Sequence, residues 1–257
     1  MMIVTLRSII AAIVLFAVTR KYKGVTYTKA DHRSFFIIGM LGYFLNMVLL
    51  QVGIAYTGAS ITSLISAMAP VTITFFAIVI LKERFTVIKG VCLILVIVSA
   101  FVILGGASGQ GEAFGIIAGF LSIITWGIAT SFIRRMNGKF PPILITANSM
   151  LCSMVFFIPF GIICSFRSTV NVNLKSVAVL LYLGVICSCL TQFLWSCCLK
   201  RMQASVCSLF YPLQPIFSAL LGFLLLGEPL KKSFFAGLAI MMVSTALSLR
   251  ETIVKKF

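Results

Sequence analysis

The chain of 257 residues is 61% hydrophobic and only 10% charged, and its 21 Lys and Arg against 5 Asp and Glu give a net charge of +16. Soluble domains are about 45–50% apolar and about 25% charged, so this composition excludes a water-soluble enzyme or binding module. The positive charge does not indicate nucleic-acid binding, because no long basic stretch interleaved with aromatic residues is present. A polytopic membrane protein is predicted.

Nine apolar runs are long enough for transmembrane helices, which need about 20 residues to cross a hydrocarbon core of roughly 30 Å. Alternating β patterns are absent, and lipid offers the backbone no hydrogen bonds, so an all-α helical bundle is expected. In chain order the predicted spans are Met2–Thr19, Ser34–Ala55, Ser60–Leu81, Val87–Leu104, Ala113–Phe132, Pro142–Ser165, Val177–Leu199, Ala204–Leu226 and Ser233–Leu249.

Lys and Arg residues are distributed unevenly between alternate loops. The segments after odd-numbered spans hold 16 of them and the opposite segments hold four. Because cytoplasmic loops are enriched in Lys and Arg, this split predicts an outside amino terminus and a cytoplasmic carboxyl terminus. The basic cluster follows the first span rather than preceding it, which is the reverse of a secretion signal. Minimal loops and the lack of a retrieval signal favour a bacterial inner (plasma) membrane.

The reactive residues do not form a recognisable catalytic or metal site. All eight cysteines lie inside apolar runs and are interpreted as small apolar packing residues, and the only histidine, His32, is in a loop. No HExxH, GxSxG or buried acid pair is present, so an intramembrane enzyme is not favoured. Neither a cofactor nor a metal is expected.

The sequence contains an internal repeat at an offset of 145 residues. This offset superposes Gly58–Phe85 on Gln203–Leu230 and aligns a mid-helix proline, Pro70 with Pro215, and a helix-end glutamate, Glu83 with Glu228. The third and eighth spans, which carry the two copies, are five spans apart, so the copies are expected to be inverted. Inverted repeats are a recurrent architecture of secondary transporters, whose substrate sites lie at the repeat interface.

The repeat segments resemble EamA-type transporters of the drug/metabolite transporter superfamily. The resemblance rests on GIAYTGASITSL, on the helix ends VILKERF and LLLGEPL, and on Leu6–Phe16, which is similar to that family's second helix. It implies a ten-helix fold of two five-helix repeats, of which this chain lacks the first helix. Residues 1–105 would then form a first repeat of four helices, and residues 112–250 a second repeat of five.

Polar residues within the spans are the candidates for a central cavity. Pro70 and Pro215 leave backbone carbonyls unpaired, and helix packing is the alternative explanation for them. Tyr211 and Gln214 lie within one turn before Pro215 and are the first candidates. Four amides and one indole could line the cavity, or could hold helices together or anchor them at the membrane interface. These residues are Asn46, Gln51, Trp126, Asn148 and Gln192.

Arg7 is the one clear charge within a span. It could extend its side chain outward to the interface, or it could bind a substrate carboxylate or phosphate. The five acids all lie at span ends or in loops, which disfavours proton coupling through a buried carboxylate in this chain.

The leading hypothesis is a carrier that exports a small metabolite or amino acid by alternating access, with the substrate class taken from the family resemblance alone. A nucleotide-sugar or sugar-phosphate exchanger is the second, and it should show several basic residues in mid-span. A truncated, non-transporting partner subunit is the third. Gly115 and Gly119 form a GxxxG that predicts a close helix contact within the chain or in a homodimer.

Overall fold

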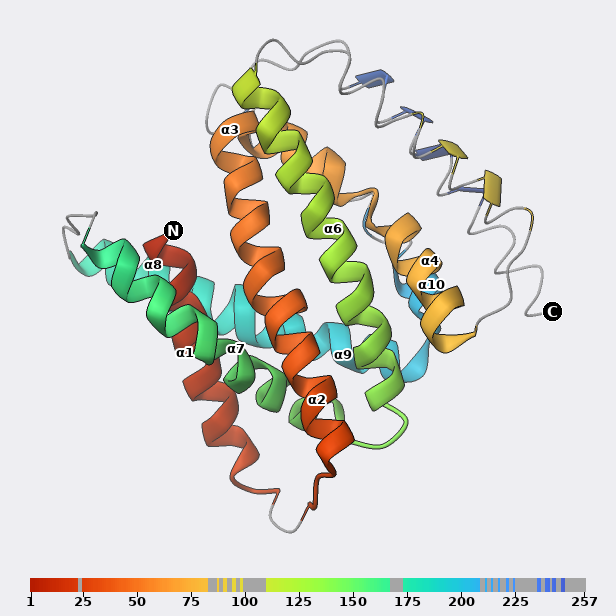
Figure 1. Cartoon of the computed structure of the whole chain (residues 1–257). Helices are drawn as coiled ribbons and strands as arrows, with labels where there is room; N and C mark the ends of the chain where they lie inside the picture. The colour runs from red at the N-terminus through yellow and green to blue at the C-terminus, as the bar shows by residue number, and fades with distance from the viewer. Residues whose placement is uncertain are drawn as a thin grey trace. The chain divides into compact units, whose positions relative to one another are not determined.

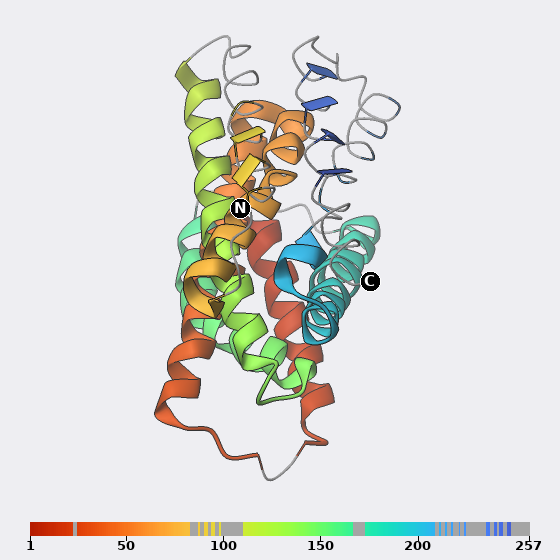
Figure 2. The ribbon, with the colours of Figure 1, turned by 90° about the vertical axis from the view of Figure 1, so that its right-hand side faces the viewer.

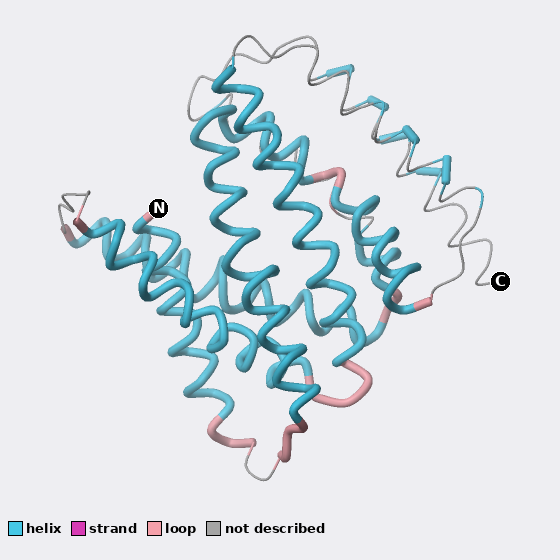
Figure 3. The backbone as a smooth tube through the Cα atoms, in the orientation of Figure 1, coloured by secondary structure: helices cyan, strands magenta, loops and turns pink. Residues whose placement is uncertain are grey.

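The computed structural model describes residues 1–22, 25–82, 110–166 and 173–208, with isolated positions between 87 and 98 and between 211 and 247. These residues form helices joined by short loops and include no strand (Figures 1 and 3). Five helices in the described residues are long and apolar enough to cross a membrane, and Ala69–Leu81 is a shorter apolar helix. The five are Met2–Thr19, Lys29–Ala59, Ala113–Met136, Pro142–Ser165 and Ser176–Arg201.

The predicted all-α class is confirmed for the described residues, and several span limits agree with the sequence. Helices α1 (Met2–Thr19) and α7 (Pro142–Ser165) begin and end as predicted. Helix α6 (Gln110–Met136) overruns its predicted span and has two arginines in its last turn, where cations stabilise the negative helix end. The count of nine spans stays a prediction, because Val87–Leu104, Ala204–Leu226 and Ser233–Leu249 fall largely outside the described residues.

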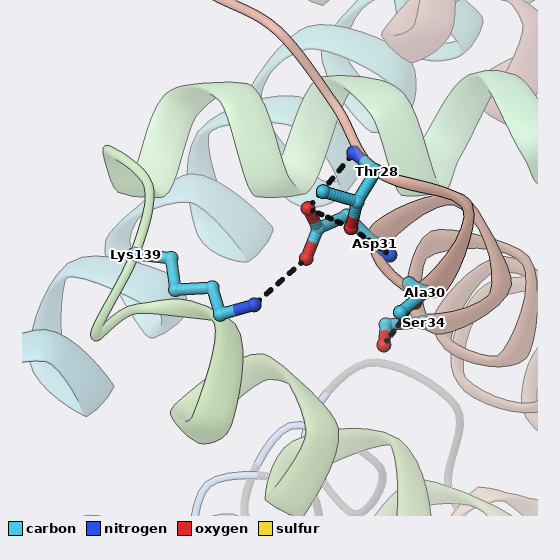
Figure 4. Close-up of polar contacts among 5 residues, drawn as sticks. All are labelled: Thr28, Ala30, Asp31, Ser34 and Lys139. Carbon is cyan, nitrogen blue, oxygen red and sulfur yellow. Dashed lines mark hydrogen bonds and ion pairs between the residues drawn. The ribbon is translucent and has the colours of Figure 1, made fainter.

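Helix α2 (Lys29–Ile37) starts five residues before the predicted Ser34, because its first turn is capped. The Thr28 hydroxyl accepts a bond from the Asp31 amide at 3.3 Å, and the Thr28 amide donates to Asp31 Oδ2 at 3.1 Å. This capping box satisfies helix-end amides that hydropathy does not reveal. Lys139, in the loop after α6, forms an ion pair with Asp31 at 3.2 Å (Figure 4).

The chain divides into two compact units that each draw on distant parts of the sequence. Unit 1 comprises Met1–Val48 and Phe132–Gln203, and unit 2 comprises Leu49–Ser131 and Ala204–Phe257. These units describe spatial packing, whereas the predicted boundaries at 1–105 and 112–250 describe an internal sequence repeat. The repeat boundaries therefore remain a prediction.

Unit 1 is built around α1 and α7, which pack against each other. Helix α1 also packs on the π-helix η2 (Leu183–Leu190), and α7 packs on the π-helix η1 (Ile38–Leu45) and on α9 (Thr191–Arg201). Figure 2 shows this group of helices turned by 90° from Figure 1. Its core is formed by fully buried side chains, among them Leu15, Phe35, Ile38, Ile145 and Phe157.

Two stretches of unit 1 follow the same succession of elements at an offset of 145 residues. We call residues 28–48 segment A and residues 173–193 segment B. Segment A contains α2 and η1, and segment B contains α8 (Leu174–Tyr182) and η2 at equivalent bounds. Both return to α-helix at equivalent positions, Asn46 and Thr191. Because π-helical stretches are rare and short in proteins, their recurrence at one offset is a specific similarity.

Each π-helix has a glycine at its second position, and each glycine allows a close helix contact. A Cβ on Gly39 of η1 would collide with the carbonyl oxygen of Ser149 and lie 3.0 Å from the amide nitrogen of Ser153, both on α7. A Cβ on Gly184 of η2 would lie 2.7 Å from Cγ2 of Ile10 on α1. The two glycines therefore bring η1 onto α7 and η2 onto α1.

In unit 2, α3 (Asn46–Ser66) is interrupted at Gly58, whose φ of 79° is in a region that favours glycine. This interruption falls in the predicted loop between the second and third spans. A second break, at Ala67 and Met68, separates α3 from α4 (Ala69–Leu81). Pro70 lies in the first turn of α4, where its missing N–H costs nothing. The structure thus has a helix break next to Pro70, and it places this proline at the start of a helix rather than in the middle of one, where the sequence pattern had predicted it.

Helix α6 packs closely on α3 within unit 2, and the two run side by side in Figures 1 and 2. A Cβ on Gly115 would lie 2.7 Å from Cγ2 of Thr57, and one on Gly119 would lie 3.1 Å from Cδ1 of Ile65. The GxxxG pair therefore makes a contact inside the chain. Nothing in the described residues supports its predicted alternative, a homodimer.

Candidate functional site

Arg7 and the neighbourhood of Asn46 come together in unit 1. The half-buried Arg7 side chain extends from α1 to the start of α3, where its Nη2 donates to the Sδ of Met47 at 2.9 Å. The Arg7 Nε is shielded from solvent and has no hydrogen-bond partner among the described residues. Asn46, the neighbour of Met47, is 9% exposed. Two predicted site residues, Arg7 and Asn46, therefore lie in the same region of unit 1.

Gln192 on α9 is another predicted residue, and it is 8% exposed. Its Oε1 is buried and lacks a partner among the described residues. One turn later on the same helix face is Ser196, whose carbonyl oxygen accepts a 3.0 Å bond from Nδ2 of Asn137. The Asn137 Oδ1 and Ser196 Oγ are also buried without a described partner. Gln192 and Ser196 on α9, together with Asn137 just after α6, therefore present buried oxygens to which a water or a polar ligand could donate a hydrogen bond.

Asn148 on α7 serves a different place, near the beginning of that helix. Its Nδ2 donates to the Tyr27 hydroxyl at 3.1 Å and to the carbonyl oxygen of Leu144 at 2.9 Å. The Tyr27 ring contacts Phe35 and Phe140 at centroid distances of 5.4 and 5.3 Å. Asn148 is thus part of an aromatic cluster that joins the loop before α2 to α7, which is the helix-contact role considered in the sequence analysis.

In unit 2 the structure brings Trp126 and Tyr211 together. The Trp126 Nε1 on α6 donates to the Tyr211 hydroxyl, and Trp126 is 7% exposed. Tyr211 belongs to a turn in which the backbone N–H of Gln214 donates to the backbone carbonyl oxygen of Tyr211 at 2.9 Å. Gln214 is exposed. Trp126 is thus a buried hydrogen-bond donor.

Two further candidates, Gln51 and Pro70, are in unit 2, and one lies beyond the described part. Gln51 is half-buried on α3, and Pro70 begins α4. Close to Pro70, Thr72 donates to the carbonyl oxygen of Ile123 on α6 at 2.8 Å and ties the broken helix to its neighbour. Pro215 lies outside the described residues.

Sequence reasoning missed Met47 and Asn137. Met47 looks like an ordinary apolar residue, and Asn137 follows two arginines at a span end, which assigned it to a loop. The arginines have a structural role: Arg134 Nη1 donates to the carbonyl oxygens of Leu199 and Lys200 and so caps the end of α9. Among the described residues no three His, Cys, Asp or Glu side chains gather as a metal site. The polar groups present are suited to recognising a ligand by hydrogen bonds.

The comparisons with known proteins agree with a membrane transporter. Residues 1–105 and 113–250 match the EamA-like transporter family. An uncharacterized transporter of Archaeoglobus fulgidus is 26% identical over 86% of this chain and 79% of its own length. An uncharacterized transporter of Clostridium kluyveri is 21% identical over 96% of this chain and 82% of its own length.

One solved crystal structure is similar in fold, with a TM-score of 0.72 and 16% sequence identity over 96% of this chain and 88% of that chain. The family match, the names of the relatives and the apolar helices together make this a multi-pass membrane protein of transporter type. The chain belongs to the EamA-like transporter family.

Proposed function

We propose that this chain is a secondary transporter that exports a small metabolite, such as an amino acid, by alternating access between two inverted repeats. In such carriers two related helical bundles rock against each other around a substrate site between them. The proposed orientation places the amino terminus outside and the carboxyl terminus in the cytoplasm, as the distribution of Lys and Arg indicates.

The observation that carries the proposal is the agreement between segments A and B. They change from α-helix to π-helix and back at equivalent residues, and the offset of 145 is the one that aligns Pro70 with Pro215. Packing is reciprocal as well, since η1 lies on α7 and η2 lies on α1. A duplicated unit accounts for both facts, because each copy would repeat the same solution for packing its helices.

The inversion is testable by labelling the two equivalent N-cap positions, Thr28 and Asn173, which are both exposed. Single cysteines are introduced at these positions in a variant whose native cysteines are replaced by serine or alanine. A membrane-impermeant maleimide is then applied to intact cells and to inverted vesicles. We expect Asn173→Cys to react in intact cells and Thr28→Cys only in inverted vesicles. Reaction of both from the same side would contradict the inversion.

Transport itself is tested in proteoliposomes loaded with pooled isotope-labelled amino acids, sugar phosphates and nucleotide sugars. We expect efflux of one class in the presence of the wild-type chain and at least a tenfold loss in Pro70→Ala, because alanine favours a continuous helix across the break. The matched control is Pro159→Ala, inside α7, which should keep the efflux. The alternative result is that protein-containing liposomes release no more solute than empty ones, with efflux appearing only when a second membrane protein is added. That result would identify the chain as a partner subunit.

A further inference from the structure

Arg7 is a charged group whose hydrogen-bonding capacity is unmet in the described residues. Among the described residues, the acceptor that the guanidinium has is the thioether of Met47, and its Nε has none there. A thioether is a weak acceptor, as is the thiol of Cys187, which is close enough to interact with the guanidinium. A guanidinium in an apolar span needs anionic or strong oxygen acceptors to offset its lost hydration.

The chain offers Arg7 no carboxylate in its described part. The one acidic side chain described there is Asp31, which is bound by Lys139 and by both the amide and the hydroxyl of Thr28. Asp31 is therefore engaged at the start of α2 and does not neutralise Arg7. The described protein groups around the guanidinium thus include no strong oxygen acceptor for it.

The backbone that carries Arg7 is held firmly by its neighbours. The carbonyl oxygen of Arg7 is 3.2 Å from the Cβ position of Gly184, where η2 packs on α1. Arg7 lies five residues after the start of α1, and its half-buried side chain extends sideways to Met47 at the start of α3. A guanidinium held in this way inside an apolar span has lost part of its hydration.

We propose that Arg7 is a binding position for an oxyanion, a carboxylate or a phosphate, that accepts bonds from Nε and from one Nη. A planar guanidinium suits these groups because two parallel N–H donors match two oxygens. The oxyanion belongs to a transported solute or to a lipid headgroup. Binding can be measured without transport, so the failure of either proposal leaves the other distinguishable.

The equivalent position in the second copy sharpens the inference to one site per chain. There the counterparts of Arg7 and Met47 are Cys152 and Gln192, which are both uncharged. The positive charge of Arg7 is therefore not repeated at the equivalent position, Cys152. The expected stoichiometry is therefore one oxyanion bound through Arg7 per chain.

The test is equilibrium binding to the purified full chain in a neutral detergent, at constant ionic strength maintained with sodium chloride. Acetate and inorganic phosphate are the anionic probes, and acetamide is the neutral match for acetate. We expect an anion, but not acetamide, to bind and to raise the unfolding temperature of the wild type. Binding should weaken at least tenfold in Arg7→Gln and remain in Arg33→Gln, which removes the same charge from an exposed site.

A second pair of variants keeps the test decisive if Arg7→Gln does not fold. Arg7→Lys keeps the charge but loses the paired donors, so binding should weaken several-fold. Met47→Leu removes the thioether and should leave binding unchanged. Wild-type binding by Arg7→Lys, or loss of binding in Met47→Leu, would overturn the proposal, because the guanidinium would then be a structural partner of the sulfur.

The source of the oxyanion is separated in a lipid arm. The same unfolding measurement is made in vesicles of phosphatidylcholine with and without phosphatidylglycerol. Stabilisation by phosphatidylglycerol that requires Arg7, without any response to acetate or phosphate, assigns the site to a lipid headgroup. A response to the free anions assigns it to a solute. No response of the wild type in either arm would refute an oxyanion site.

Discussion

Segments A and B of unit 1 share their element boundaries and differ in the side chains that use them. Both have an N-cap, a π-helix and a glycine contact at equivalent residues. The polar groups differ: segment A has a full capping box and an ion pair, and segment B has a single capping residue and a buried amide. The backbone packing of the two segments is thus alike where helices touch, whereas their polar groups differ.

The largest expected effect comes from the glycine contacts. Gly39→Ala should lower the free energy of unfolding by about 3 kcal/mol, because the added methyl group meets backbone atoms of α7 that have no rotamer to change. Gly184→Ala should cost less, about 1–2 kcal/mol, because its nearest neighbours are Cγ2 and Cβ of the Ile10 side chain, at 2.7 and 2.8 Å, and the nearest backbone atom is 3.2 Å away. Chemical unfolding in detergent micelles measures both.

Gly138→Ala is the control for these glycines, since its Cβ would be 3.5 Å from the nearest atom and in ordinary contact. It should leave the unfolding midpoint unchanged. If Gly39→Ala and Gly184→Ala prove equally mild, the close approach of the π-helices to α1 and α7 is wrong.

The next effect separates the two helix starts. Thr28→Ala should cost about 1–2 kcal/mol, because it removes the accepting hydroxyl of the capping box and loosens Asp31, which Lys139 also binds. Asn173→Ala should cost about 0.5–1 kcal/mol, because Asn173 is exposed and caps Ser176 alone. Hydrogen exchange of the first-turn amides in α2 and α8 measures each effect locally. A larger loss of protection in α8 than in α2 would contradict the prediction that the capping box is the stronger cap.

The smallest effect has the opposite sign. Gln192→Met places in segment B the residue that segment A has at the equivalent position. It should raise the free energy of unfolding by about 1 kcal/mol, because a buried carbonyl oxygen without a described partner is removed. Thermal unfolding measures this stability, and Ser196→Ala, which removes a neighbouring unpartnered hydroxyl, is the matched companion. Clear destabilisation by both would show that these oxygens have partners.

The combination of stability and transport then sharpens the functional comparison. If Gln192 contacts the transported solute, Gln192→Met gains stability and loses efflux in the proteoliposome assay. Met47→Gln is the reciprocal exchange, and it offers Arg7 an amide oxygen in place of a thioether. It should weaken anion binding at Arg7 several-fold through competition. Unchanged binding in Met47→Gln would place the anion away from this contact.

The sequence by itself determined the membrane character, the limits of α1 and α7 and the break before α4. These features depend on local properties: the hydropathy of a run of residues, and the missing N–H of Pro70. The start of α2 was missed because hydropathy assigns the polar residues before Ser34 to a loop. The capping box of Thr28 and Asp31 nevertheless makes them helical. The sequence also carried a weak trace of the repeat in segments A and B, in Gly39 with Gly184, which the alignment from Gly58 onward did not reach.

Only the tertiary structure decided which distant residues meet. It placed the GxxxG of α6 on α3 inside the chain, bonded Trp126 to Tyr211, and left the Arg7 guanidinium against a thioether. It also revealed the π-helices, which have no sequence signature of their own. The physical reason is common to all of these: whether a glycine, an amide or a charge has a partner depends on the helix packed against it, and one helix's sequence does not specify its neighbour.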